Sequence, residues 1–260
     1  MYKRYFLIVL FFVFALCTAQ TANVVFVDSV QIEADQYYGK DVLGYDYYAK
    51  NNVLYKQTKT EKWEYKNLPF GKIHSIDFIN PLKIVLFYKD FNSVVLLDNQ
   101  LSEITRINFS DYTIVAQTCS VASQNRLWIY DSLTNNLLLL DYLNKKATPL
   151  NQPFKNTFVY YKSDYNNWLR ISENNEIISC NNYGRTTLLG SVPEFDKILI
   201  TDSQKIIFSL TDNLYLYKTE NSESELLFSS EKNIKNFDYK NGVLSIFTGK
   251  TIENYNIKLP

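Results

Sequence analysis

Short apolar runs separated by turns rich in Asn and Asp dominate the chain from residue 42 onward. One unit, made of an apolar run, a polar turn and a second apolar run, occurs at residues 42–56, 83–98, 126–141, 167–180, 205–218 and 242–256. The first apolar residues after the six turns recur every 37 to 43 residues and are Val53, Val94, Leu137, Ile177, Leu214 and Ile252. This pattern predicts six β-hairpins within an internal repeat.

The turns of these hairpins share a simple chemistry. They are Asn51-Asn52, Asn92-Ser93, Asn135-Asn136, Asn174-Asn175, Asp212-Asn213 and Thr248-Gly249. Asn and Asp tolerate the left-handed backbone conformation that tight hairpins need. The chain has only 7 Gly, so we expect Asn to take over much of the turning.

A further strand is predicted on either side of each hairpin. Segments of strand character precede the hairpins at 73–79, 113–122, 158–163, 197–202 and 234–239, and others follow them at 61–68, 103–109, 185–192 and 225–230. Four strands in each unit of about 40 residues are typical of a β-propeller blade. We therefore predict an all-β chain that forms a single β-propeller of six four-stranded blades.

The two ends of the chain predict how the ring closes. The last repeat lacks an outermost strand, and the segment from Asn23 to Val27 has no blade of its own. We expect this N-terminal strand to complete the last blade, which removes two exposed edges. The strands ahead of Asp41 are hard to assign, so five or seven blades remain alternatives. A β-sandwich pair or a barrel is the competing fold.

The first residues predict export. Lys3 and Arg4 precede an apolar run from Tyr5 to Leu16, which is shorter than the roughly 20 residues of a membrane span. Small residues follow, and a signal peptide over residues 1–19 would leave a propeller domain over 20–260. Lipidation at Cys17 is the disfavoured alternative, because Leu16 is not the small residue that the lipoprotein peptidase requires.

The composition limits which partners the chain can bind and indicates the state of its cysteines. The 27 basic and 27 acidic residues cancel, which gives no electrostatic footprint for nucleic acid. The 21 Tyr and 17 Phe favour strands. Two cysteines follow the signal segment, Cys119 and Cys180; we expect two buried free thiols, with a disulfide as the alternative.

Residues of catalytic type are sparse. His74 is the single histidine, which disfavours a zinc site and weakens any Ser-His-Asp or Cys-His arrangement. Carboxylates recur with the repeat at strand ends and turns, where Asp is expected for backbone reasons; they are Asp46, Asp77, Asp90, Asp131, Asp164, Asp202 and Asp212. We predict no cofactor, no metal and no enzymatic activity.

Aromatic residues supply the candidates for partner binding. Trp128 and Trp168 occupy corresponding places in successive repeats, so we expect them to pack between blades. Tyr45, Tyr47 and Tyr48 cannot all be buried if one face of their strand is exposed, and exposed Tyr is enriched at protein interfaces. These three tyrosines are therefore the predicted partner-binding residues.

The richness in Lys, Asn, Tyr and Phe, the few glycines and a signal that ends at Ala19-Gln20 resemble an envelope protein of the Bacteroidota. The sixfold hairpin repeat resembles the periplasmic propellers of those bacteria, some of which are accessory components of the outer-membrane barrel-assembly complex or of the type IX secretion translocon. This resemblance implies a non-catalytic scaffold in the periplasm, associated with an outer-membrane protein complex. The alternative is a carbohydrate-binding or carbohydrate-active propeller with its site at the central channel.

Overall fold

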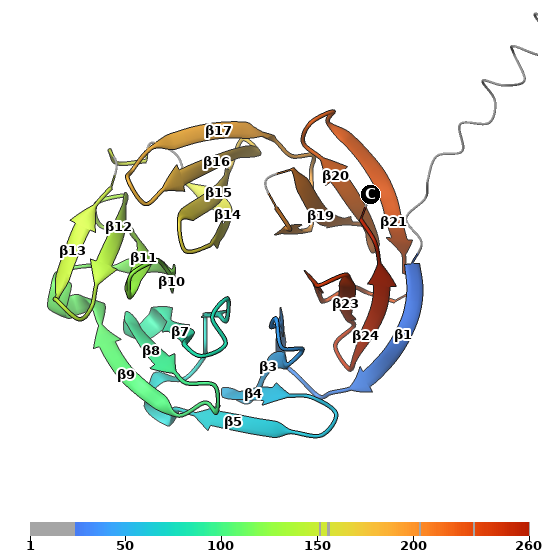
Figure 1. Cartoon of the computed structure of the whole chain (residues 1–260), viewed down its shortest axis with the longest axis horizontal. Coiled ribbons are helices and arrows are strands. Elements are labelled where there is room, and N and C mark those ends of the chain that lie inside the picture. The colour runs from blue at the N-terminus through green and yellow to red at the C-terminus, as the bar shows by residue number, and fades with distance from the viewer. Residues whose placement is uncertain (1–23, 151, 155–156, 203, 231, 260) are drawn as a thin grey trace, which may run out of the picture.

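The computed structural model describes residues 24–150, 152–154, 157–202, 204–230 and 232–259. The predicted signal peptide and Cys17 lie outside the described residues. Within them, six four-stranded antiparallel sheets are arranged as the blades of a ring (Figure 1). The predicted six-bladed propeller is confirmed, and no helix in the described ranges is long and apolar enough to span a membrane.

Each blade runs from an inner strand to an outer one. The first three blades are blade 1, with β2 (Gln36–Lys40), β3 (Asp46–Lys50), β4 (Val53–Gln57) and β5 (Lys62–Lys66); blade 2, with β6 (Ser75–Asp77), β7 (Ile84–Tyr88), β8 (Ser93–Leu97) and β9 (Glu103–Asn108); and blade 3, with β10 (Ala116–Val121), β11 (Arg126–Asp131), β12 (Asn136–Asp141) and β13 (Lys146–Pro149).

The other three are blade 4, with β14 (Phe158–Ser163), β15 (Asn167–Ser172), β16 (Glu176–Asn181) and β17 (Thr186–Ser191); blade 5, with β18 (Lys197–Ile200), β19 (Lys205–Leu210), β20 (Asn213–Lys218) and β21 (Glu223–Ser229); and blade 6, with β22 (Asn236–Lys240), β23 (Val243–Phe247), β24 (Thr251–Ile257) and β1 (Val24–Gln31). Short 3₁₀ turns cover Leu68–Phe70, Lys89–Phe91 and Phe109–Tyr112.

The ring closes through the N-terminal strand. β1 pairs antiparallel with β24, from Val24 opposite Ile257 to Gln31 opposite Thr251. The predicted closure is confirmed, and the strand is longer than the predicted segment ending at Val27. In its second half, Asp28 to Gln31, partly buried and exposed residues alternate, which is the pattern of a strand with one side in solvent.

The hydrophobic core is divided among the blade interfaces. Each of six buried clusters lies between two successive blades. In blade 2 every residue of β7 and β8 is buried, because neighbouring blades cover both faces of the sheet. This explains why the middle strands read as continuous apolar runs rather than alternating ones.

The hairpin turns behave as predicted. Positive φ angles occur at Asn51, Asn52, Asn92, Asn135, Asn175, Asp212 and Gly249. Two strands were not predicted, namely β2 and β13. β13 has a single partly buried residue, Ala147, among exposed ones, so it carries little hydrophobic signal.

The closing interface makes a direct stability test. Ile252 is fully buried, pairs with Val30 of β1 and packs between blades 6 and 1. We expect Ile252→Ala to lower the free energy of unfolding by about 2–4 kcal/mol, measured by urea denaturation, because it leaves a cavity at the closure. Ile104→Ala on β9, where the side chain is 52% exposed, is the control and should cost less than about 0.5 kcal/mol.

Candidate functional site

Charged side chains on the inner strands of alternate blades link each blade to the next. Asp77 of β6 accepts the N–H of Val121 at 2.8 Å, and Asp238 of β22 accepts the N–H of Lys40 at 2.7 Å. In blade 4, Lys162 of β14 donates its ammonium to the carbonyl of Ile200.

The three residues whose backbone groups take part in these bonds occupy equivalent places in their blades. Val121, Ile200 and Lys40 are each the last residue of an inner strand, in β10, β18 and β2. Asp77, Lys162 and Asp238 therefore form one charged ring of alternate blades around the central axis. We call these three residues the inner ring.

Burial sets the electrostatics of the inner ring. It raises the pKa of Asp77 and of Asp238, because desolvation disfavours the charged carboxylate, while the backbone N–H bonds act in the opposite direction. It lowers the pKa of Lys162, which the charge of Asp238 opposes. The charge of Lys162 favours the ionised form of both carboxylates and so offsets part of their desolvation.

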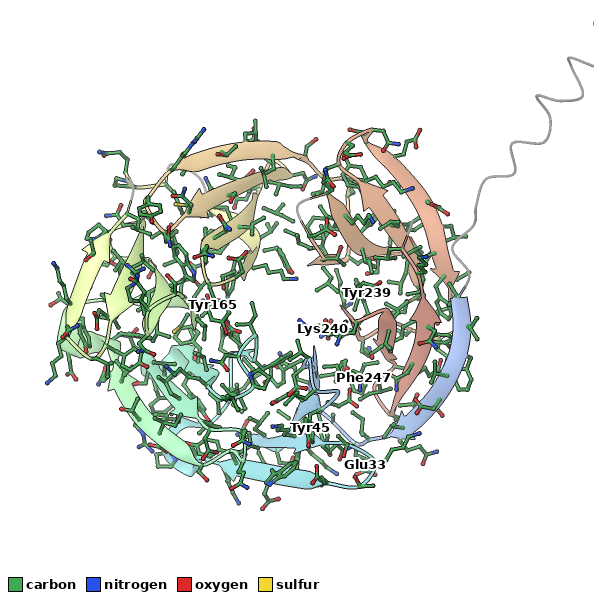
Figure 2. The ribbon with its side chains drawn as sticks, viewed as in Figure 1. Glu33, Tyr45, Tyr165, Tyr239, Lys240 and Phe247 are labelled. Carbon is green, nitrogen blue, oxygen red and sulfur yellow. The ribbon has the colours of Figure 1, made fainter. Side chains whose placement is uncertain are left out.

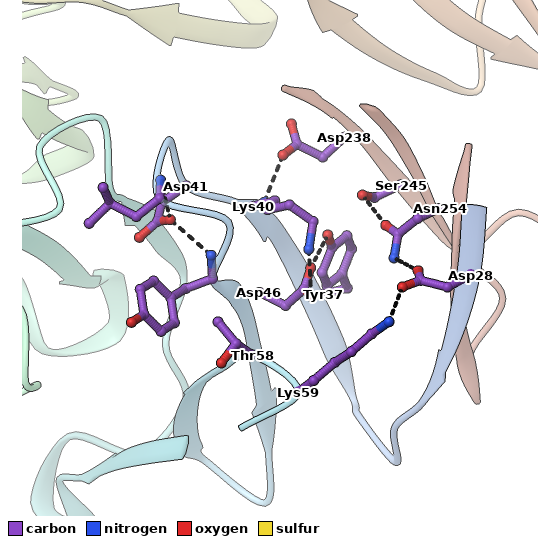
Figure 3. A network of polar contacts seen from close by, with 12 residues as sticks. Asp28, Tyr37, Lys40, Asp41, Asp46, Thr58, Lys59, Asp238, Ser245 and Asn254 are labelled. Carbon is purple, nitrogen blue, oxygen red and sulfur yellow. Dashed lines mark hydrogen bonds and ion pairs between the residues drawn. The ribbon is translucent and has the colours of Figure 1, made fainter. Parts of the chain in front are cut away.

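A second polar network joins blade 6 to blade 1 (Figure 3). Besides its N–H bond to Asp238, Lys40 forms an ion pair with Asp46 at 2.7 Å, and buried Tyr37 donates its hydroxyl to the same carboxylate at 2.9 Å. Gly39 has a φ of +133°, and a Cβ there would lie 2.7 Å from the Asp238 carboxylate. Only glycine allows this close approach of the two inner strands.

The outer part of the same interface is also polar. Asp28 of β1 accepts the amide of Asn254 at 2.7 Å and pairs with Lys59 of blade 1 at 2.7 Å. The hydrogen bond from Lys59 holds the pKa of Asp28 below its usual value. Both networks complete the ring closure, so we assign them a structural role.

The predicted partner-binding tyrosines are placed differently from expectation. Tyr47 and Tyr48 are buried, which leaves Tyr45 as the one accessible ring of the three. Tyr47 stacks on Phe78 of blade 2 at 4.6 Å, and Tyr48 packs in the cluster between blades 6 and 1. Both rings are buried although they point to opposite faces of β3, because neighbouring blades cover both faces.

Tyr45 alone of the three is partly exposed. Its hydroxyl donates to Glu61 at 2.6 Å, its ring lies edge-on to Trp63 at 5.4 Å, and the ammonium of Lys56 sits 4.4 Å from the ring centre. These contacts hold Tyr45 within blade 1.

The other expectations for aromatic and sulfur residues are confirmed. Trp128 and Trp168 are fully buried in the cluster between blades 3 and 4, and the indole N–H of Trp128 donates to the carbonyl of Asp164 at 2.8 Å. Cys119 and Cys180 are buried free thiols. Neither tryptophan can stack on a sugar at the central axis, and Trp63 lies on the outer strand β5.

Most predicted carboxylates serve the backbone, as expected. Main-chain N–H groups in or beside turns donate to Asp131, Asp164, Asp202 and Asp212. His74 is exposed and edge-on to Phe87. Within the described ranges no three His, Cys, Asp or Glu residues gather as metal ligands. Sequence reasoning noted Asp77 but missed Asp238 and Lys162, although IDF at 76–78 and FDY at 237–239 share an apolar–Asp–aromatic pattern.

Comparison with known proteins shows the fold alone. No protein-family model matches the chain, and no curated protein matches it in sequence. Similar solved structures include a streptogramin B lyase, with a TM-score of 0.58 and 11% identity over 92% of this chain and 98% of that chain. A catalytically inactive virginiamycin B lyase from Staphylococcus aureus with quinupristin has a TM-score of 0.61 and 10% identity over 91% and 100%. BamB from Moraxella catarrhalis has a TM-score of 0.53 and 9% identity over 92% and 99%.

These neighbours correct one prediction. The prediction that the chain is not an enzyme is wrong in excluding catalysis, because solved propellers of similar fold include lyases. The sparse catalytic motifs of the sequence do not exclude chemistry on this scaffold, since function depends on individual sites rather than on the fold.

Asp238 is expected to make stability depend on pH. Its pKa in the folded state is raised above the ordinary value of 3.8. At a pH between the unfolded and the folded pKa, the folded chain therefore binds more protons than the unfolded chain. The stability that this carboxyl contributes is present below about pH 4 and is lost as the pH rises through the folded pKa. Asp238→Asn keeps an acceptor for the Lys40 N–H but cannot ionise. We expect its free energy of unfolding, relative to the wild type, to increase with pH in urea titrations.

Asp90, an exposed carboxyl in the β7–β8 turn, supplies the matched control. Asp90→Asn should leave the pH dependence unchanged. Parallel wild-type and Asp238→Asn curves would contradict the inner-ring assignment.

Proposed function

We propose that the chain is an exported propeller that scaffolds or stabilises a protein complex at the periplasmic side of the outer membrane. The Bacteroidota-like composition and signal segment support this compartment, and the propeller fold, which BamB shares, supports a binding scaffold. A role in outer-membrane protein assembly or in type IX secretion follows from the same resemblance. The observation that carries the proposal is the outer edge of blade 6.

This edge exposes three consecutive apolar side chains. Val25, Phe26 and Val27 of β1 are 51%, 56% and 48% exposed. β1 is the outermost strand of its sheet, and a bulge between Phe26 and Asp28 interrupts its pairing with β24. An edge strand presents unpaired N–H and C=O groups on its free side, so this segment combines open backbone groups with apolar side chains.

Blades 1, 2 and 3 protect their edges more strongly. The outer strands β5, β9 and β13 carry exposed charged residues or proline, which are Lys62, Glu64 and Lys66, then Glu103 and Arg106, then Lys146 and Pro149. Charges and proline at an edge discourage pairing with another chain. The first half of β1 has no such protection.

The apolar strip formed by Val25, Phe26 and Val27 lies near blade 5, whose outer strand β21 precedes β1 along the rim of the ring (Figure 1). Leu226 of β21 is 52% exposed. Tyr255 of β24 joins the two blades, with its ring 5.6 Å from that of Phe26 and 4.8 Å from that of Phe228. We propose that an extended, apolar segment of a partner protein adds a strand to β1 and covers this strip.

The test combines affinity purification with a photo-crosslinker. A tagged chain with a photoreactive residue at position 26 is irradiated in the native envelope, solubilised in detergent and analysed by mass spectrometry. We expect a crosslink to one outer-membrane or periplasmic protein. Phe26→Lys should reduce recovery of that protein at least about tenfold, because a charge replaces a buried apolar contact.

Leu188→Lys is the matched control, since Leu188 lies on the outer strand β17 and is 61% exposed. It should recover the partner as well as the wild type does, and thermal melts should show both variants folded. Recovery of the chain alone, or equal loss with both variants, would contradict the proposed docking edge.

A further inference from the structure

A polar pocket of about 310 Å³ lies where blades 4, 5 and 6 meet. Lys162 reaches it from the end of β14, Asp202 and Lys205 from the turn and first residue of β19, and Tyr239 and Lys240 from the end of β22. Figure 2 shows Tyr239 and Lys240 on the side of blade 6 that faces the centre of the ring. Three lysines from three successive blades thus surround one small pocket.

None of these lysines forms an ion pair with another described residue. The ion pairs found in the described part of the chain involve Lys40, Lys50, Lys59, Arg106, Lys218 and Lys232 instead. The ammonium of Lys162 donates to the carbonyl of Ile200, yet an ammonium group has three donors. Lysine charge at this pocket therefore has unused capacity to bind an anion.

The nearby carboxylates are already engaged by backbone N–H groups. Asp202 accepts from Gln204 at 2.8 Å and Lys205 at 2.9 Å, which fixes it in the turn. Asp238 accepts the N–H of Lys40. Among the described residues, neither carboxylate forms an ion pair with Lys162, Lys205 or Lys240.

Burial makes an anion at this position favourable. Desolvation lowers the pKa of Lys162 and disfavours its charged form; the charges of Asp238, Asp202 and Asp164 oppose this effect, and that of Lys240 adds to it. A negatively charged group placed among the three lysines adds a further opposite charge beside a partly buried ammonium, where the attraction is stronger than in bulk water.

We propose that this pocket binds a small anionic molecule through an oxyanion group, either a phosphate or a carboxylate. Its volume suits a small metabolite rather than a polymer, and its polar lining favours charge over apolar shape as the means of recognition. The Tyr239 ring forms part of the wall. This ligand site is separate from the blade 6 edge and does not depend on the proposed docking there.

Isothermal titration calorimetry on the mature chain at low ionic strength tests the site. Inorganic phosphate and citrate serve as the two probes and separate the two chemistries. We expect saturable 1:1 binding of at least one probe, weakened by added salt. Lys205→Gln and Lys240→Gln should each weaken it about five- to tenfold, as loss of one charged contact does.

Lys146→Gln on the outer strand β13 is the control for general loss of positive charge, because Lys146 is exposed and its blade contributes no residue to the pocket. It should leave binding unchanged, and so should Phe26→Lys, which separates this site from the docking edge. The proposal is overturned if neither probe binds up to about 10 mM, or if Lys146→Gln weakens binding as much as the pocket variants do.

Discussion

The pairing of β1 with β24 is the constraint on which the rest of the structure depends. A blade is a thin sheet with apolar residues on both faces, and only its two neighbours can cover them. If the ring stays open, the facing surfaces of blades 6 and 1 lose their cover, including Tyr37, Tyr48 and Ile252. Closure therefore completes the last of six similar interfaces, so that every blade is covered on both faces by a neighbour.

The inner strands contact neighbouring blades through polar side chains, whereas the middle strands pack through apolar ones. Near the axis six strands converge, and their apolar faces give way to polar side chains that reach the next blade. Asp77, Lys162 and Asp238 each satisfy a backbone group at the end of a neighbouring inner strand. Lys162 takes part in one of these bonds and also lines the polar pocket between blades 4, 5 and 6, so the blade contact and the proposed anion site share this residue.

Much of the architecture follows from local sequence patterns. Apolar runs, Asn turns and a constant spacing predict the hairpins and the repeat, because each depends on contacts within about 40 residues. The closing strand pairs the two ends of the chain, and it is predictable because one apolar segment has no blade and the last blade lacks a strand. The sites depend on contacts between blades, which no local pattern reveals. Tyr47 and Tyr48 are buried because a neighbouring blade covers each face of β3, and Asp238 gains its role from Lys40, a residue near the opposite end of the chain. β13 escaped prediction because its residues are mostly exposed.

The closing strand also sets an order on folding. β1 comes first along the chain, and its partner β24 comes last. When a ribosome makes the chain at about 5–20 residues per second, β1 waits roughly 10–45 seconds for β24 to appear. During that interval Val25, Phe26 and Val27 belong to an unpaired apolar strand at the leading end. A chain of this topology depends on protection of its first strand until its last strand arrives, and a holding chaperone can recognise the same strip that the folded protein leaves exposed.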